Sequence, residues 1–388
     1  MPKKLPHFFS LRLFLVVFFA VALAIFLYFV FPTLVATTYE RGVSLEGNAS
    51  SLTEIFPVPW KATHLPNPAP TKALYMTSYV AGNKEIRAKL VELADTTEIN
   101  TLVIDIKDYS GYVSFKVEDP TLIKIGSSKW RIPDVKEFIQ ELHGKNIYVI
   151  GRVAVFQDPL MVTKRPDLAV KRASDQTLVW EDYKGISWID PGSVEYWDYM
   201  VSLGKEAYRV GFDELNFDYI RFPSDGNMTD IFYPSSDGRV KREVLADFFA
   251  YLHDHLKPTG VALSADLFGM TTTNTDDLNI GQVLEDALPY FDFIDPMVYP
   301  SHYPPTFMGF ANPAVKPYEV VKYSMEQAVS RASTTPFKLR PWLQDFDLGA
   351  DYTPEMVRAQ IQATYDVGLT SWMLWNARNV YTGEALDK

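Results

Sequence analysis

Cysteine is absent from this chain of 388 residues, and its absence excludes several kinds of chemistry. Without thiols the protein forms no disulfide, binds no metal through thiolates, and has neither a nucleophilic nor a lipid-modified cysteine. A chain without free thiols is also suited to an oxidising compartment outside the cytoplasm.

Positive charge is scarce as well, since 37 lysines and arginines stand against 48 aspartates and glutamates, for a net charge of −11. Non-specific nucleic-acid binding needs a basic surface, so we expect no nucleic-acid partner. The sequence also lacks a Gly-x-Ser-x-Gly nucleophile elbow, a Walker loop and a dinucleotide-binding fingerprint. We therefore predict a protein that works without a cofactor.

One long uncharged run is present near the N-terminus, over residues 13–32. Its 20 residues are enough for a membrane-spanning helix, and Lys3, Lys4, His7 and Arg12 precede it. The positive-inside tendency places residues 1–12 in the cytoplasm and the rest of the chain outside, as a single-pass protein of the cell membrane. Residues 34–36 form a weak cleavage site, so a released form is the alternative.

Residues 33–71 show no clear periodicity and are rich in proline. Proline stiffens a chain without giving it a core, so this segment is expected to be a semi-rigid stalk or a strap on the domain surface. The domain itself is expected over residues 72–388.

Strand-like and helix-like segments alternate through this domain. Apolar or alternating runs predict strands over 73–80, 101–107, 147–155, 214–222, 261–268, 291–299, 337–344 and 370–375. A helix is predicted after each strand but the last, over 84–97, 133–144, 193–208, 240–256, 281–288, 317–332 and 354–367. Eight such units predict a (β/α)8 TIM barrel. The main alternative is an open doubly wound sheet, but the glycine-rich turn usual after its first strand is missing.

Polar and aromatic side chains gather where the predicted strands end, which is where barrels build their active sites. Each one alone has an ordinary explanation, such as a turn-forming aspartate or a surface histidine. Together they suggest a common face lined by Asp105, Lys107, Tyr109, Arg152, Asp218, Tyr219, Arg221, Asp266, Asp295, Tyr299, His302, Tyr303, Trp342, Asp345, Trp375 and Asn376.

Several acids on one face suit glycoside hydrolysis, which uses one carboxyl group as acid and another as nucleophile or base. Arginine and tyrosine would orient the nucleophile, while tryptophan and tyrosine would form a platform for sugar rings. A metal-dependent hydrolase is the competing class, but it would want histidine pairs on strands, and only His302 lies near the expected rim. We therefore predict no metal ligands, although an oxygen-only Mg²⁺ or Ca²⁺ site stays open.

The segment 213–223, with Asp266, the run 295–303 and the run 372–376, resembles the bacterial family described as "putative glycosyl hydrolase domain". The resemblance covers about residues 72–380. It implies a (β/α)8 fold near the α-amylase-like and α-galactosidase-like barrels. It also implies that Asp218, at the end of the fourth strand, is the nucleophile.

The acid/base partner is less well defined by the same resemblance. The α-amylase pattern places it after the fifth strand, where this chain has Asp266, and the α-galactosidase pattern places it after the sixth, at Asp295. Asp266 is preferred, because Pro296 gives Asp295 the surroundings of a turn. A chitinase mechanism is disfavoured, since Ile220 stands where that pattern has its catalytic glutamate.

The resulting hypothesis is an exported, membrane-tethered glycoside hydrolase acting on an extracellular or cell-envelope polysaccharide. Two alternatives remain, a carbohydrate-binding barrel without turnover and a metal-dependent polysaccharide hydrolase or deacetylase. The sugar, the linkage and the stereochemical outcome are left open at this point.

Overall fold

The computed structural model of the chain describes residues 60–388. The expected cytoplasmic segment 1–12, the expected membrane span 13–32 and most of the expected stalk lie outside the described residues. Within residues 60–388, no helix is both long enough and apolar enough to cross a membrane.

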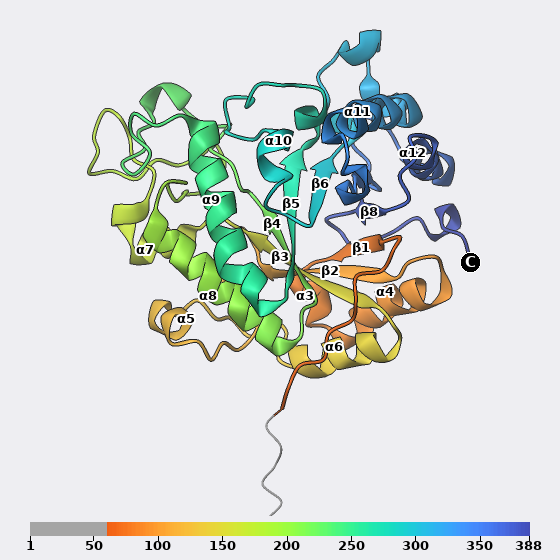
Figure 1. Cartoon of the computed structure of the whole chain (residues 1–388), viewed down its shortest axis with the longest axis horizontal. Helices are drawn as coiled ribbons and strands as arrows, with labels where there is room; N and C mark the ends of the chain where they lie inside the picture. The colour runs from red at the N-terminus through yellow and green to blue at the C-terminus, as the bar shows by residue number, and fades with distance from the viewer. Residues whose placement is uncertain (1–59) are drawn as a thin grey trace, which may run out of the picture. The chain divides into compact units, whose positions relative to one another are not determined.

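Eight parallel strands close into a barrel in the order of the chain, which confirms the predicted fold (Figure 1). Each strand is hydrogen-bonded to the next, and β8 closes on β1. The strands are β1 (Lys72–Met76), β2 (Thr101–Lys107), β3 (Tyr148–Ala154), β4 (Glu214–Asp218), β5 (Ala262–Phe268), β6 (Phe293–Met297), β7 (Trp342–Gln344) and β8 (Trp372–Trp375).

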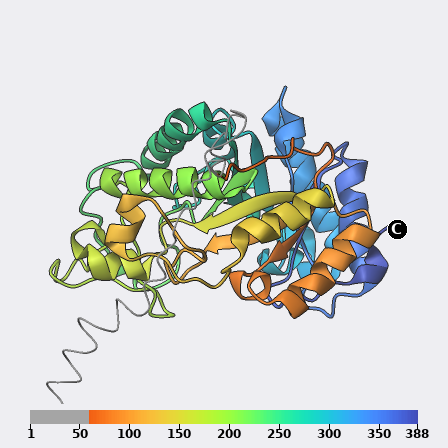
Figure 2. The same cartoon turned by 90° about the horizontal axis from the view of Figure 1, so that it is seen from below.

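Helices surround the barrel, with α8 beside α9 on one side and α11 beside α12 on another (Figures 1 and 2). Local chemistry sets several of their starts: the Asn83 side chain accepts hydrogen bonds from the first turn of α4, and proline opens α11 and α12. The helices are α3 (Ser78–Ala81), α4 (Lys84–Thr96), α5 (Pro120–Ile125), α6 (Val135–Gly144), α7 (Pro159–Lys164), α8 (Val194–Val210), α9 (Lys241–Leu256), α10 (Leu284–Ala287), α11 (Pro317–Ala332) and α12 (Pro354–Asp366).

Several strands are shorter than predicted, and the shortening of β4 bears directly on the candidate site. The prediction continued to residue 222, whereas β4 ends at Asp218 because Tyr219 adopts a left-handed backbone with φ of +53°. This conformation interrupts the extended chain that a strand ladder requires. The polar residues after Asp218 are therefore part of a loop, not of the sheet.

Two apolar layers stabilise the barrel. One lies between the strands and the surrounding helices and includes Leu74, Phe217 and Phe248. The other lies inside the barrel and includes Val103 and Met373. Alternate residues of a strand point to opposite faces, so each strand contributes to both layers, and β2 and β3 are buried along their whole length.

Residues 60–71, all of which the prediction assigned to the stalk or surface strap, pack on the N-terminal end of the barrel. The backbone N–H of Leu65 donates to Asp213 Oδ1 over 2.8 Å, and Asn67 Nδ2 lies 3.2 Å from Glu214 Oε2. The same Asp213 carboxylate binds His143 Nε2 at 2.9 Å. This strap belongs to the barrel, so the domain begins before the predicted boundary at residue 72.

The loops that follow β3 and β4 are tied together at the opposite, C-terminal end of the barrel. Lys171 and Phe232 exchange two backbone hydrogen bonds, and Asp190 Oδ2 accepts one from the N–H of Ser235 over 2.6 Å. Because these contacts join segments about 50 residues apart, they form a stable rim above the strand ends.

A buried ion cluster links three strands near the N-terminal end. Arg340, just before β7, donates to Glu214 of β4 over 2.5 Å and to Asp295 of β6 over 3.0 Å. All three side chains are at most 1 % exposed. Charges buried this deeply stabilise a fold only while every partner is present.

Replacing Arg340 with methionine should therefore lower the free energy of unfolding by about 3–5 kcal/mol, because it leaves two carboxylates buried without their cation. Urea denaturation followed by circular dichroism measures this loss. The matched control is Arg239→Met, which removes an exposed arginine paired with Asp247 and should cost at most about 1 kcal/mol. Equal losses in the two variants would contradict the role given to the cluster.

Candidate active site

A cavity of about 450 Å³ opens at the C-terminal ends of the strands. It lies where (β/α)8 barrels place their active sites. The residues that line it are Arg152, Asp218, Tyr219, Arg221, Phe268, Gly269, Met270, Met297, Tyr299, His302, Tyr303 and Trp375. Eight of the predicted site residues are among them.

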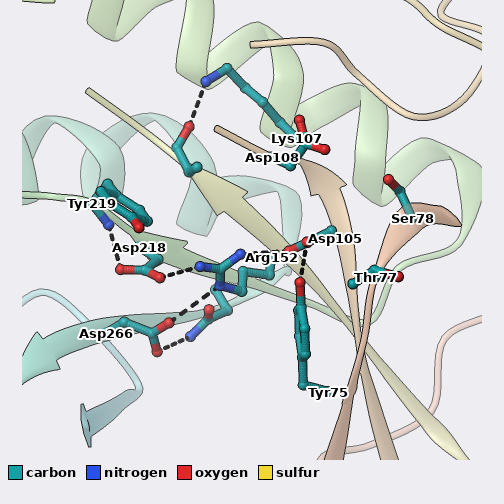
Figure 3. A network of polar contacts seen from close by, with 12 residues as sticks. Tyr75, Thr77, Ser78, Asp105, Lys107, Asp108, Arg152, Asp218, Tyr219 and Asp266 are labelled. Atoms are coloured by element: carbon teal, nitrogen blue, oxygen red, sulfur yellow. Dashed lines mark hydrogen bonds and ion pairs between the residues drawn. The ribbon is translucent and has the colours of Figure 1, made fainter. Parts of the chain in front are cut away.

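The buried guanidinium of Arg152, from β3, organises the floor of this cavity (Figure 3). Its Nη1 donates to Asp105 Oδ1 of β2 over 2.6 Å, and its Nη2 donates to Asp218 Oδ2 of β4. Its Nε lies 3.7 Å from Asp266 Oδ2 of β5. One cation thus holds carboxyl groups from three different strands.

Asp218 lies at the end of β4 and lines the cavity. While Arg152 contacts its Oδ2, the backbone N–H of Tyr219 donates to its Oδ1 over 2.5 Å. Tyr219 itself has a left-handed backbone, which ends β4 directly after this carboxylate. A bulky residue in that conformation is uncommon and is found at functional sites more often than elsewhere.

Asp266 stands beside Asp218 in the sheet. The pairing of β4 with β5 joins Phe217 to Ala265, so the next step along both strands brings these two aspartates side by side. Asn216 Nδ2 and Trp342 Nε1 both donate to Asp266 Oδ1, over 2.9 and 2.7 Å. This arrangement leaves Oδ2 as the oxygen that can hold a proton.

The environment of Asp266 favours that proton. Burial is the largest effect that raises the pKa of Asp266 well above its usual value, and the nearby charges of Asp218 and Asp295 add to it. Arg152 opposes the shift only in part. The two neighbouring carboxyl groups therefore have different surroundings, a pattern typical of acid/base pairs.

Asp295, the other acid considered from the sequence, is placed differently. It is fully buried, does not line the cavity, and belongs to the ion cluster of Arg340 and Glu214. Burial raises the pKa of Asp295 to about 6, against the opposing charge of Arg340. These contacts give it a structural role in the barrel interior.

Aromatic side chains form one wall of the cavity. Trp375 stacks on Tyr75 with their ring centroids 3.8 Å apart, and Trp342 lies edge-on to Trp375 from below. Tyr299 and His302 pack edge to face with centroids 5.3 Å apart. Burial lowers the pKa of His302, which keeps the ring neutral near pH 7.

This wall separates the cavity from a second one of about 530 Å³. Tyr299, His302 and Trp375 line both spaces. Asp345 and Asn376 line only the second cavity, and Asp345 accepts hydrogen bonds from the backbone N–H and the hydroxyl of Thr382. The two cavities together offer room for more than one sugar unit, and the aromatic wall lies between them.

Lys107 and Tyr109 lie outside both cavities. A register irregularity between Asp105 and Lys107 turns the lysine away from the Arg152 cluster, as Figure 3 shows. Its ammonium is fully buried 3.1 Å from Asp158 Oδ2. Tyr109 is 60 % exposed. Trp342 and Asp105 support the site from beneath, since neither lines a cavity.

Sequence reasoning missed Tyr75, whose hydroxyl donates to Asp105 Oδ2 below the cavity. The residue lies within an apolar strand, where an aromatic ring resembles ordinary core. Phe268, Gly269, Met270 and Met297 were also missed, although the first two lie just after Asp266 in the chain. The only sequence feature that indicates these residues is their position at or just after the end of a strand.

Residues 60–388 contain no group of three or more histidine, aspartate or glutamate side chains arranged to hold a metal ion.

Comparison with solved structures shows the same fold in several sugar-processing proteins. The glycoside hydrolase domain of PgaB from Bordetella bronchiseptica superposes with a TM-score of 0.60 at 13 % identity, covering 80 % of this chain and 95 % of that one. α-L-Fucosidase isoenzyme 2 from Paenibacillus thiaminolyticus gives a TM-score of 0.56 at 12 % identity, covering 82 % of this chain and 47 % of that one.

A hypothetical protein from Ruminiclostridium thermocellum is 39 % identical, over 50 % of this chain and 96 % of its own, with a TM-score of 0.46. No curated protein matches the chain significantly. The family described as "Putative glycosyl hydrolase domain" matches residues 73–381, which is nearly the whole barrel and confirms the resemblance noted in the sequence. The chain therefore belongs to this family of glycosyl hydrolase domains.

Proposed function

We propose that this protein hydrolyses glycosidic bonds, with Asp218 as nucleophile and Asp266 as general acid and base. The observation that supports this most is the contrast between the two neighbouring carboxyl groups. Asp218 faces the cavity with Arg152 and the N–H of Tyr219 on its oxygens, while the pKa of Asp266 is raised by burial.

In this mechanism Asp218 attacks the anomeric carbon while Asp266 gives its proton to the leaving oxygen. Asp218 loses its negative charge as it bonds to the anomeric carbon. Arg152 holds the carboxyl group of Asp218 in place until water releases the sugar. Asp266, then ionised, takes a proton from that water. Trp375 and Tyr299 offer flat faces against which the sugar ring can stack.

A carbohydrate-binding barrel without turnover is the second candidate, and one observation favours it. Asp266 is only 1 % exposed and does not line the cavity. Catalysis therefore requires that substrate binding brings the leaving oxygen within reach of Asp266 Oδ2. Hydrolysis of any glycoside that depends on Asp218 would rule out this candidate.

The variants Asp218→Asn and Asp266→Asn should differ in how they depend on the leaving group. Asp218→Asn should lose at least about a thousandfold in kcat on every substrate, because no nucleophile remains. Asp266→Asn should lose about a hundredfold or more on polysaccharide but much less on aryl glycosides, whose leaving group needs no proton. Initial rates on both substrate types, with Asp295→Asn for comparison, measure this difference.

The pH profile provides the control for this assignment. The wild-type rate on polysaccharide should fall as pH rises through the raised pKa of Asp266, because the acid loses its proton. This alkaline limb should be absent in Asp266→Asn when an aryl glycoside is the substrate. If the limb persists there, another group is the acid.

Retention of anomeric configuration is expected from the placement of the two acids. Neighbouring strands lie ~4.8 Å apart, and both carboxyl groups lie on the Nε–Nη2 side of one guanidinium. That spacing fits the ~5–5.5 Å of retaining enzymes better than the ~6.5–9.5 Å of inverting ones. Proton NMR of the first-formed product distinguishes the two, and an inverted anomer would make Asp218 a base instead of a nucleophile.

We also propose that the enzyme is exported and tethered to the cell membrane, where it acts on a cell-envelope or extracellular polysaccharide. The uncharged run at 13–32, its basic flank and the lack of cysteine support this. Full-length protein should sediment with membranes and be digested by protease added outside intact cells, whereas a variant lacking residues 13–32 should do neither. Retention of the full chain in the soluble cytoplasm would exclude the proposal.

A further inference from the structure

Four arginines are buried in the described part of the chain, and one of them lacks an anionic partner. Three are paired with carboxylates within 4.0 Å: Arg87 with Asp134, Arg152 with Asp105 and Asp218, and Arg340 with Glu214 and Asp295. The fourth, Arg221, has no carboxylate within this distance in residues 60–388, although it is only 7 % exposed. Arginine is almost never buried unless it is paired, so this position needs an explanation.

The surroundings of Arg221 are aromatic instead of acidic. The centre of its guanidinium lies 4.8 Å from the ring of Trp188, 4.9 Å from Phe268 and 5.5 Å from Tyr219. Burial is the largest effect that lowers its pKa, and the more distant acids restore only part of the loss. Contact with aromatic faces offsets some of the cost of removing the charge from water but does not supply a counter-ion.

The hydrogen bonds of Arg221 fix its orientation and leave one edge available. Nη1 donates to the carbonyl of Phe222 and to Ser224 Oγ, both over 3.1 Å. Nε and Nη2 have no acceptor in residues 60–388, and neither is among the side-chain atoms fully enclosed without a partner. Because Arg221 lines the cavity together with Asp218, this edge is accessible from the space where substrate would lie.

We propose that Arg221 recognises the carboxylate of an acidic sugar, so that the substrate is a uronic-acid-containing polysaccharide. The two N–H groups on the Nε–Nη2 edge match the two oxygens of a planar carboxylate in spacing and direction. This inference rests on the proposed glycosidase function, since it places an acidic sugar unit within the same cavity as the nucleophile.

The charges around the cavity favour a single negative charge on the ligand. Arg152, the other cation that lines it, is already bound to Asp105 and Asp218, and the lowered pKa of His302 leaves that ring neutral. A doubly charged phosphate would meet one available cation and the carboxylate of Asp218. A carboxylate carries a single negative charge, so it neutralises Arg221 and brings no excess negative charge next to Asp218.

Binding can test the inference without any turnover. Isothermal titration of the full chain carrying Asp218→Asn should show binding of oligogalacturonate or of hyaluronan oligosaccharides, and at least about tenfold weaker binding of the same oligosaccharides with their carboxyl groups reduced. Adding Arg221→Gln should remove this preference for the acidic form, and Arg221→Lys should keep part of it. The control Arg239→Gln removes an exposed arginine that is paired with Asp247, and it should leave both affinities unchanged.

The outcomes separate this inference from the proposed function. Equal affinity for acidic and reduced oligosaccharides, or an acidic preference that survives in Arg221→Gln, would overturn the role of Arg221. Tighter binding of inorganic phosphate or sulfate than of glucuronate would overturn the assignment to a carboxylate. If acidic oligosaccharides bind through Arg221 but the unsubstituted enzyme hydrolyses none of them, the inference stands and the glycosidase proposal fails. Circular dichroism and thermal melts of each variant exclude misfolding as the cause.

Discussion

The buried guanidinium of Arg152 is the group on which the candidate site depends. It contacts or approaches carboxyl groups from β2, β4 and β5, which lie on the two sides of its own strand, β3, in the sheet. Its position is itself supported by Tyr75 of β1, which binds the same Asp105. The candidate site is therefore a property of the assembled sheet, since no single strand or loop contains enough of it.

Buried charges are paired less completely at the C-terminal end of the barrel than near the N-terminal end. Near the N-terminal end, Arg340 is matched by Glu214 and Asp295, and the three side chains exclude water almost completely. At the C-terminal end the matching is incomplete, because Asp266 lies 3.7 Å from Arg152 and Arg221 has no carboxylate within 4.0 Å among residues 60–388. The first arrangement serves stability. The second leaves charged groups incompletely paired at the end of the barrel where the loops give access, so a substrate can pair with them.

Much of this organisation could be predicted from the sequence, since buried parallel strands have a strong apolar signature. All eight strands and seven main helices were expected, and the acids at the strand ends were expected to share one face. The preference for Asp266 over Asp295 rested only on Pro296, because the contacts that distinguish the two acids lie across the barrel. Asp266 and Asp295 are paired in neighbouring strands, yet only Asp295 lies against Arg340. The arginine that separates their roles lies 45 residues further along the chain.

Lys107 shows the limit of strand periodicity. It is two residues from Asp105 and would share its face in a regular strand, but the irregular register with β3 turns it toward Asp158. The free edge of Arg221 was equally hidden, because a sequence shows which charges exist but not which of them are left without a counter-ion.

The turn at Tyr219 has an implication for how the family can diversify. One of the two donors that hold Asp218 is a main-chain N–H, which no substitution other than proline removes. What position 219 must preserve is the left-handed backbone, a condition that glycine, asparagine and aspartate meet readily. The aromatic ring at this position can therefore be exchanged for another surface toward the sugar while the orientation of Asp218 is inherited unchanged.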